Sequence, residues 1–481
     1  MSLAASSNSI VSFVIFIFLS RILSPKDIGL MALALIIVDM GRFVVTGGLT
    51  QAIIQKDKWD EIYASTCFYI NLAYAIIVSG IIIFIVAPLA STHYDPHSGS
   101  VIKLLSIILF AEGLKAISEG KLKRVFAYRA IAYRSMVSGL ISGVVGIYLA
   151  INNYGVYALV WQQITNHTLV MLITILSAKW LPSLKFSIAQ AKIISKFATP
   201  LMLAQVIGSF SFNIFEILIG IIIGPLALGF YRVGGRALFI LQDMILKPFE
   251  YTALSALSRV SGPEAQAQAS MRMIRISTYI IFPIFFGAAA ISTQFIVFAF
   301  GEKWFASGSI MTILALGVAP TVISYNIEAA LTACGKSQLV MKISIIGFTI
   351  NCIVALISIP FGLTIAACGF LLKNYILVLF NLFFFKNTFE KTYVQLFKIT
   401  VPNLTSSILM FLIVIIFQHQ TARFFSGFFE IIIACTIGIF SHIALSLFIF
   451  KEETKNFINE SSDFIPAKFS PILKTLKKII L

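Results

Sequence analysis

Residues 25–29 read Pro-Lys-Asp-Ile-Gly and residues 225–229 read Pro-Leu-Ala-Leu-Gly, so the motif P-x-x-[IL]-G occurs twice with a spacing of 200 residues. Each copy lies between two apolar stretches. Because proline ends the incoming helix and glycine permits a tight turn, we expect a short outer hairpin at each copy. Each copy also falls between the first and second helices of a six-helix block, which favours an internal duplication of the kind found in transporters built from parallel repeats.

Apolar stretches of membrane-spanning length surround both copies of the motif. The chain of 481 residues is 59% hydrophobic and 12% charged, whereas a soluble domain carries about 25% charged residues. Its mean hydropathy is +0.96. Fourteen transmembrane helices are therefore expected, near residues 4–22, 29–52, 65–90, 100–118, 131–151, 155–178, 195–223, 227–252, 272–299, 307–333, 338–358, 361–385, 398–418 and 428–450.

The duplication divides this all-α membrane protein into parts. We expect a first lobe of helices 1–6 in residues 1–190, a second lobe of helices 7–12 in residues 191–392, and helices 13 and 14 in residues 393–450. The basic tail, residues 451–481, has two readings that the sequence leaves open. It is either an amphipathic helix on anionic lipid, using Lys474, Lys477 and Lys478, or a solvated frayed end. The glycine pairs at 47–48 and 234–235 occupy corresponding helices and predict close packing or bending.

The distribution of charge indicates topology. The net charge is +16, but the basic residues are spread over many short loops, so no nucleic-acid partner is expected. With both termini in the cytoplasm, most loop lysines and arginines fall on the cytoplasmic side, as the positive-inside rule requires. The richest predicted loop holds Lys121, Lys123, Arg124, Arg129 and Arg134. The first apolar stretch has no basic n-region and no cleavage site, so it is expected to be a membrane helix and not a signal peptide. The five cysteines lack metal-ligand spacing and are interpreted as packing residues.

Charged residues within membrane helices are costly, so those that remain are candidates for function. Three sets form acid-then-base pairs at i, i+3 or i, i+4, which places both charges on one helix face. We expect the whole set to line a hydrated cavity, whereas for any single pair a structural ion pair between helices is the alternative. The candidates are Asp39, Arg42, Glu112, Lys115, Glu216, Asp243, Lys247, Glu250, Glu328 and Lys373. Lys115, Glu250 and Arg42 are close enough to helix ends for snorkelling to be an alternative.

Several ordered motifs resemble polysaccharide-exporting flippases of the Wzx/colanic-acid-exporter type. In the first half these are residues 19–30 (LSRILSPKDIGL) and residues 48–55 (GLTQAIIQ). In the second half they are residues 228–231 (LGFY), 253–259 (ALSALSR), 300–304 (FGEKW) and 333–336 (ACGK). The resemblance covers nearly all of the chain. Family members carry more residues ahead of the first motif, so the first helix is expected to be short or truncated. Serine at position 255 replaces the proline that is commoner in the family.

The resemblance implies the fold of the multidrug/oligosaccharidyl-lipid/polysaccharide superfamily, in which two six-helix bundles form a V around a central cavity. The implied substrate is an undecaprenyl-pyrophosphate-linked oligosaccharide, which moves to the periplasmic leaflet of the inner membrane. Implied partners are membrane lipid, a polysaccharide polymerase and export proteins. Such a substrate needs cations along a hydrated path, and Arg42, Lys115, Lys247 and Lys373 are expected to supply them beside Asp39, Asp243, Glu112 and Glu328.

Two alternatives to a flippase remain. Related drug exporters often keep a coupling carboxylate in the helix that holds Glu216, so this residue is the candidate for ion coupling, with either H⁺ or Na⁺. A drug or cation antiporter of the same superfamily is the runner-up, although it favours acids with few cations. A membrane glycosyltransferase or polymerase needs a large outer loop or an acidic metal-binding cluster, and the longest predicted outer loop, near residues 91–100, is short. We therefore expect transport without catalysis, and no organic or metal cofactor.

Overall fold

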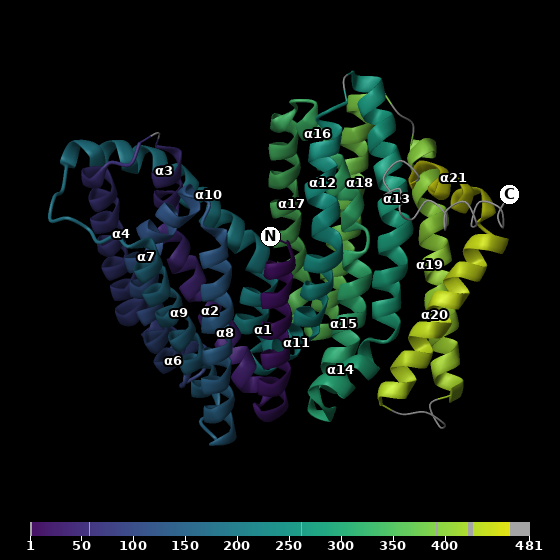
Figure 1. Ribbon diagram of the computed structural model, residues 1–481. Coiled ribbons are helices and arrows are strands. Elements are labelled where there is room, and N and C mark those ends of the chain that lie inside the picture. Colours follow the sequence, from purple (N-terminus) through teal and green to yellow (C-terminus); the bar gives the residue numbers. More distant parts are fainter. Residues whose placement is uncertain (1, 57, 261, 391–392, 422–426, 462–481) are drawn as a thin grey trace. The chain divides into compact units, whose positions relative to one another are not determined.

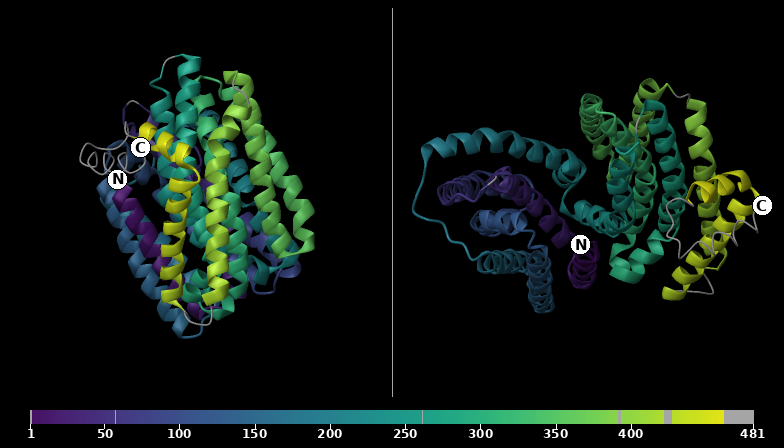
Figure 2. Two further views of the ribbon diagram at one scale, coloured as in Figure 1. Left: turned by 90° about the vertical axis from the view of Figure 1, so that its right-hand side faces the viewer. Right: turned by 45° about the horizontal axis from the view of Figure 1, so that its top comes forward.

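The computed structural model describes residues 2–56, 58–260, 262–390, 393–421 and 427–461 (Figure 1). Every regular element in these ranges is a helix. The chain divides into two compact units, residues 1–232 and 233–481, and each is described by itself. Within each unit most of the long helices run roughly along one common direction (Figure 2).

The first unit is built around helices that follow one another closely in the sequence. α8 packs on α9, α7 packs on both α9 and α4, and α1 packs on α8. The elements are α1 (Ser2–Ile22), α2 (Pro25–Thr46), α3 (Leu49–Gln55), α4 (Glu61–Ile81), η1 (Ile82–Val86), α5 (Ala87–His93), α6 (Ser98–Leu105), α7 (Ile107–Arg124), α8 (Tyr128–Ile151), α9 (Val156–Ala178), α10 (Ile188–Leu218), η2 (Ile219–Ile223) and the beginning of α11 (Pro225–Leu241).

The second unit has its own packing. α13 packs on α19 and α15, α18 packs on α15 and α17, and α12 packs on α16. After α11 the elements are η3 (Gln242–Leu246), α12 (Lys247–Leu257), α13 (Pro263–Ala290), α14 (Ser292–Phe300), η4 (Glu302–Trp304), α15 (Phe305–Val318), α16 (Thr321–Ala333), α17 (Ser337–Ser358), η5 (Ile359–Phe361), α18 (Leu363–Phe389), α19 (Tyr393–Thr421), α20 (Phe428–Phe448) and α21 (Lys451–Ser461).

The boundary between the units comes later in the chain than the expected lobe boundary at residue 190. The reason is the packing of α10, which contacts α2, α3 and α4. Ile194 and Ala198 of α10 belong to the same buried apolar cluster as Leu49 of α3 and Cys67 of α4. The helix expected to open the second lobe is therefore grouped with the first unit.

Both copies of the repeated motif begin a helix, because Pro25 opens α2 and Pro225 opens α11. Ser24 caps α2: its side chain accepts a hydrogen bond from the Asp27 amide, and the Asp27 carboxylate accepts one from the Ser24 amide. The expected role of the motif glycines was wrong. Gly29 and Gly229 lie inside the helices and not in turns, and in the second copy Gly224, with φ of 110°, makes the turn.

Eleven helices are long and apolar enough to cross a membrane, and Val11–Ile22 is a shorter apolar helix. The chain is thus a polytopic membrane protein. Two expected spans, 100–118 and 227–252, are not among the eleven. They correspond to α6–α7 and α11–α12, whose charged residues reduce their apolar character. Half of the candidate charges, five of ten, therefore lie in helices that length and composition alone do not identify as spans.

Two glycine pairs act differently in the two units. Gly48 has φ of 80° and separates α2 from α3, so the expected span 29–52 is broken there. A Cβ atom on Gly48 would lie 2.4 Å from the Ala198 carbonyl oxygen, which makes glycine necessary for the approach of α10. Gly234 lies within α11, and a Cβ atom there would lie 2.9 Å from the Ser307 carbonyl oxygen of α15. The first pair bends the chain and the second permits close packing.

Candidate functional site

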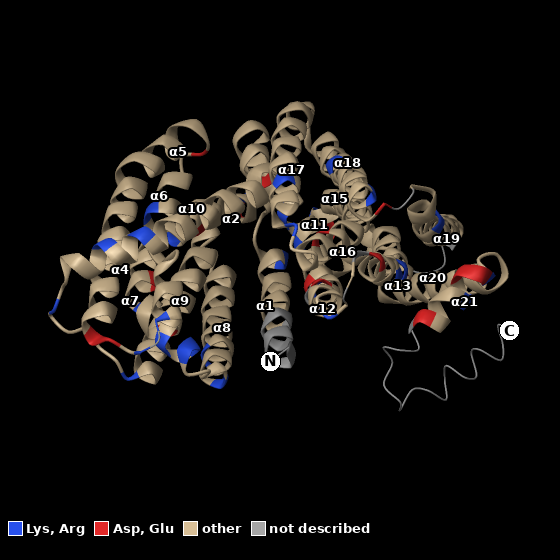
Figure 3. Ribbon diagram, turned by 90° about the horizontal axis from the view of Figure 1, so that it is seen from above, with Lys and Arg blue, Asp and Glu red and all other residues tan. Residues whose placement is uncertain are grey.

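A buried group of charges joins α7, α8 and α9 in the first unit, and we call it the α7–α9 network. It consists of Glu112, Lys115, Glu119, Arg134 and His167. Oε1 of Glu112 lies 2.9 Å from Lys115 Nζ and 2.8 Å from His167 Nδ1. Arg134 Nη2 lies 3.0 Å from Glu119 Oε2. Figure 3 shows both acidic and basic positions in the region of α7, α8 and α9.

The network is removed from solvent. Glu112 is 4% exposed, Arg134 5% and Lys115 9%. Since charges buried at this level are retained only when paired, each member depends on the others. Lys115 therefore does not snorkel to a helix end. Lys123, which is more exposed, pairs with Glu119 at 2.8 Å at the edge of the network.

Two members of the network were not predicted correctly from the sequence: Arg134 was assigned to the wrong place, and His167 was not identified. Arg134 was expected in a cytoplasmic loop, but α8 begins at Tyr128, and the Arg134 side chain bonds Thr174 of α9 and Glu119 of α7. His167 was not among the candidates. Its position in an apolar helix was the available signal, because an ionisable side chain in a membrane span is a functional candidate.

A second pair lies on α2. Arg42 Nη2 lies 3.2 Å from Asp39 Oδ1, as the i, i+3 spacing predicts. Both side chains are partly accessible, with Arg42 33% and Asp39 43% exposed. The Arg42 guanidinium also lies 5.6 Å from the ring centroid of Phe43. This cation is therefore held by one exposed partner, unlike Lys115.

A third pair lies in the second unit, where α11 passes through the π-helical turn η3 into α12. Lys247 Nζ lies 2.5 Å from Asp243 Oδ1, and the two side chains are 45% and 22% exposed. Lys247 Nζ also lies 5.5 Å from the ring centroid of Phe239. The geometry matches that of Asp39 and Arg42: an intrahelical acid, a partly exposed cation and a neighbouring phenylalanine.

The remaining candidates have separate surroundings. Glu216 of α10 forms an ion pair with Arg232 of α11, a partner that the sequence did not identify. Glu328 of α16 interacts electrostatically with Glu250 of α12. Lys373 of α18 lies 4.7 Å from the ring centroid of Phe370.

The structure confirms the three intrahelical pairs, and within the first unit the ion pairs of the candidates fall into separate groups. Across the described ranges, no ion pair connects Asp39 or Arg42 with Glu112 or Lys115. Glu216 and Arg232 likewise form a pair of their own. In the first unit the candidates of α2, α7 and α10 are thus paired within separate groups, and the expectation of a shared cavity stays a prediction.

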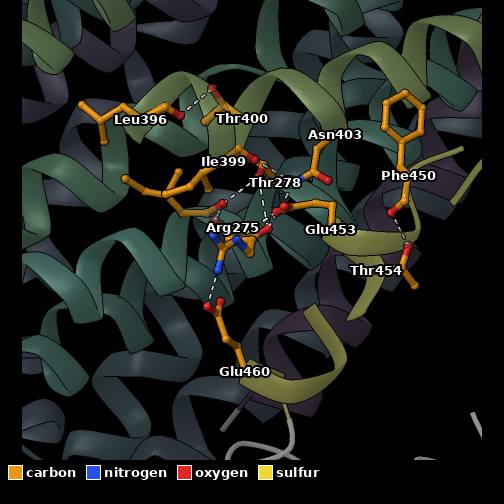
Figure 4. Close-up of polar contacts among 12 residues, drawn as sticks. Arg275, Thr278, Leu396, Ile399, Thr400, Asn403, Phe450, Glu453, Thr454 and Glu460 are labelled. Atoms are coloured by element: carbon orange, nitrogen blue, oxygen red, sulfur yellow. Dashed lines mark hydrogen bonds and ion pairs between the residues drawn. The ribbon is translucent and has the colours of Figure 1, made fainter. Parts of the chain in front are cut away.

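Another charged cluster, which the sequence missed, fixes α21 to α13 (Figure 4). Arg275 Nε lies 2.9 Å from Glu453 Oε1, and Arg275 also pairs with Glu460. The rings of Tyr279 and Phe457 stack with centroids 4.1 Å apart. Burial raises the pKa of the Glu453 and Glu460 carboxyls, against the opposing effect of Arg275.

This docking bears on the expected basic tail. Residues 451–461 form α21, which packs on α13, α19 and α20, so this part of the tail is neither frayed nor free. Thr454, 4% exposed, donates a hydrogen bond to the Ser446 carbonyl oxygen at 2.7 Å. Lys474, Lys477 and Lys478 lie outside the described residues.

Comparison with known sequences identifies one family. A family model described as polysaccharide biosynthesis protein matches residues 18–309, which include the Asp39–Arg42 and Asp243–Lys247 pairs. The succinoglycan biosynthesis transport protein ExoT of Rhizobium meliloti is 23% identical over 64% of this chain and 62% of its own length. The teichuronic acid biosynthesis protein TuaB of Bacillus subtilis is 22% identical over 62% of each chain. The chain thus spans 62% of the length of these two relatives.

Comparison with solved structures identifies the fold. The lipid II flippase MurJ in an inward closed conformation aligns with a TM-score of 0.75, covering 94% of this chain and 98% of that one at 15% identity. An inward-facing multidrug resistance MATE family transporter of the MOP superfamily aligns with a TM-score of 0.58, covering 80% and 94% at 13% identity. At these identities the likeness concerns the fold.

Proposed function

Since the chain belongs to the polysaccharide biosynthesis protein family, we propose that it is a flippase that moves an undecaprenyl-pyrophosphate-linked oligosaccharide from the cytoplasmic to the periplasmic leaflet of a bacterial inner membrane. The family match over residues 18–309 carries the proposal. The relatives support it, because one is named as a transport protein of succinoglycan biosynthesis and the structural neighbour as a lipid II flippase. The process is translocation by alternating access, with no chemical change to the substrate.

The proposed topology has fourteen transmembrane helices in two repeated six-helix blocks followed by two further helices, with both termini in the cytoplasm. The eleven apolar spans support the greater part of it. The three further helices would be α1, α7 and the α11–α12 segment. Charged residues lower the apolarity of a helix, so such a helix is not identified as a span by its composition. It can still cross the membrane when its charges form ion pairs within the protein.

Arg42 and Lys247 are the proposed first contacts for the pyrophosphate. Each is a partly exposed cation held by a single intrahelical acid, Asp39 or Asp243. Exposed ion pairs contribute about 0–1 kcal/mol, so a pyrophosphate with several negative charges can displace the acid at low cost. The displaced aspartate then competes with the pyrophosphate for the cation, which allows the pyrophosphate to be released.

Lys115 and Lys373 are proposed to contact the substrate at later stages. Lys115 is buried in the α7–α9 network, where Glu112 and Glu119 hold it. Lys373 lies over Phe370, and Glu328 is the acid proposed for the same unit. An anion can bind Lys115 only when another cation balances the charge of Glu112. Lys115 is therefore proposed to bind the substrate only under that condition.

Glu216 is the proposed site for the coupling ion, either H⁺ or Na⁺. Its carboxylate is paired with Arg232, so a coupling cation has to displace a guanidinium. A polysaccharide polymerase and export proteins are the proposed partners, since a flipped oligosaccharide must be polymerised and removed from the periplasmic leaflet.

Reconstitution tests the function directly. Purified protein is placed in phospholipid vesicles that contain an undecaprenyl-pyrophosphate oligosaccharide with a fluorescent group on the glycan, and an impermeant quencher is added outside. The protein should reduce the quencher-protected fraction relative to protein-free vesicles. If that fraction is unchanged while an encapsulated cationic drug is released down an imposed ion gradient, the chain is an antiporter and the proposal is wrong.

A further inference from the structure

We propose that Glu112 and His167 hold an exchangeable proton within the α7–α9 network, and that this proton is linked to anion binding through Lys115. The inference deepens the proposed function and rests on it only for the identity of the anion. It assigns a role to His167, which no sequence motif identified.

The position of His167 is the first argument. It lies at the midpoint of α9, eleven residues from each end, in a helix that is long and apolar enough to cross a membrane. Its side chain is 15% exposed and that of Glu112 6%. Imidazole can carry a proton or be neutral, which distinguishes this buried contact from the carboxylate–ammonium pairs around it.

The sharing of one oxygen atom is the second argument. Oε1 of Glu112 is bound by both His167 Nδ1, at 2.8 Å, and Lys115 Nζ, at 2.9 Å. When the ring is neutral, Lys115 is the only charged group among the described residues that forms an ion pair with Glu112. When the ring is protonated, Glu112 Oε1 interacts with two cations at once. The ion pair between Glu112 and Lys115 is then weaker. Protonation therefore makes the lysine available to an anion.

The surrounding charges favour this exchange. Glu119 is the second acid near Lys115, at 3.7 Å, but it is already balanced by Lys123 and Arg134. On α8, Arg134 is directed to Glu119 and to Thr174 of α9. α2 and α6 also pack on α9, yet in the described part of the chain neither contributes an ion pair to His167 or Glu112. The charge of a protonated His167 thus acts mainly on Glu112. Through Glu112 it changes the strength of the Glu112–Lys115 ion pair.

The expected behaviour is a positive linkage. Binding of a pyrophosphate by Lys115 leaves Glu112 to His167 alone, which favours the protonated ring. By thermodynamic reciprocity, protonation must raise anion affinity by the same factor, on the order of 5- to 150-fold for ordinary couplings. Anion binding should therefore take up a proton from solution.

Calorimetry measures this uptake. Purified protein in detergent is titrated with farnesyl pyrophosphate near pH 7 in two buffers of different ionisation enthalpy, which yields the protons bound per probe molecule. The wild type should take up a fraction of one proton. His167→Gln should bind the probe with no uptake, and Glu112→Gln should also reduce the uptake. His93→Gln, a change at an exposed histidine at the end of α5, is the matched control and should retain it.

The outcomes separate the inference from the proposed function. Binding without proton uptake in the wild type, or unchanged uptake in His167→Gln, overturns the linkage while leaving the flippase proposal intact. Failure of the wild type to bind any pyrophosphate probe counts against the flippase proposal. In that case side-chain NMR of histidine-labelled wild-type protein, with no probe, decides the proton site. A His167 signal that keeps one charge state from about pH 5 to 8 overturns it.

Discussion

Gly29 of α2 and Gly229 of α11, which occupy the same place in the two copies of the repeated motif, lie against each other's helices. A Cβ atom on Gly29 would lie 1.7 Å from the Pro225 carbonyl oxygen, and one on Gly229 would lie 1.9 Å from that of Pro25. The amide nitrogen of each glycine is also close to the other's Cβ position, at 2.9 and 3.3 Å. Two positions separated by 200 residues thus form one reciprocal backbone contact.

The first prediction concerns this contact. Gly29→Ala should destabilise the protein by about 1–3 kcal/mol or more, because the obstacle is backbone that cannot rotate away. The control is Gly208→Ala in α10, where a Cβ atom meets nothing within 4 Å and the helix should tolerate or gain from alanine. Thermal unfolding of detergent-purified protein, followed by tryptophan fluorescence, compares the two. Equal midpoints for both variants would show that the close approach is not maintained in the protein.

The second prediction concerns the partly exposed cations. Arg42→Leu together with Lys247→Leu should leave an inserted protein that no longer exports polymer, since both proposed pyrophosphate contacts are lost. Arg42→Lys should retain part of the activity, because a point charge attracts phosphate but lacks the guanidinium fork. Export in a deletion strain is measured against Lys342→Leu, which removes an exposed cation of α17.

A structural role for Asp39 and Arg42 makes a different prediction. Removing a whole ion pair is often neutral for stability, so Asp39→Leu with Arg42→Leu should then be tolerated. If the pair is functional, that double variant should be folded and inactive. Wild-type export from the Arg42 and Lys247 double variant would refute the assignment.

The third prediction concerns the docking of α21 to α13. Burial raises the pKa of the Glu453 and Glu460 carboxyls above the ordinary value of 4.5 when α21 is docked. A raised carboxyl pKa means that the docked state binds protons more tightly than the undocked state. Docking is therefore strongest below about pH 4.5 and weakens as the pH rises through the raised values.

A spin label on Glu452→Cys, an exposed position of α21, reports this docking. Its mobility should increase from about pH 5 to 8. Glu453→Gln with Glu460→Gln keeps the size of both side chains and should abolish the pH dependence. The same pH dependence in that variant would assign the change to other groups.

The fourth prediction concerns orientation. A reporter fused after residue 460 should be active only in the form that requires a cytoplasmic location, and a fusion in the 152–155 turn between α8 and α9 should give the opposite result. A periplasmic signal at residue 460 would overturn the proposed topology, because the proposal places this residue in the cytoplasm.

Much of the helical architecture could be predicted from the sequence, because length and apolarity largely determine membrane helices. The intrahelical pairs were also predictable, since spacings of three and four place Asp39 beside Arg42 and Asp243 beside Lys247. The family resemblance, drawn from motifs such as LSRILSPKDIGL, agrees with the matched family model.

Contacts between helices were not predictable in the same way. Helical periodicity does not say which neighbour a face meets, so Arg232 beside Glu216 and His167 beside Glu112 were missed. Arg134 was assigned to a loop because its charge was taken to indicate solvent, whereas Glu119 and Thr174 satisfy it inside the protein. The docking of α21 depends on Arg275, a residue far away in the sequence.

The reciprocal contact of Gly29 and Gly229 has an evolutionary consequence. In a dimer of two identical halves, one substitution at this glycine would place two side chains in the same space, and the two would have to be accommodated together. Under the internal duplication that we propose, each copy can change alone, but every change at one copy is constrained by the backbone of the other. Among homologous chains the two positions should therefore vary as a linked pair, and a larger residue at one should be accompanied by separation of the helices at both.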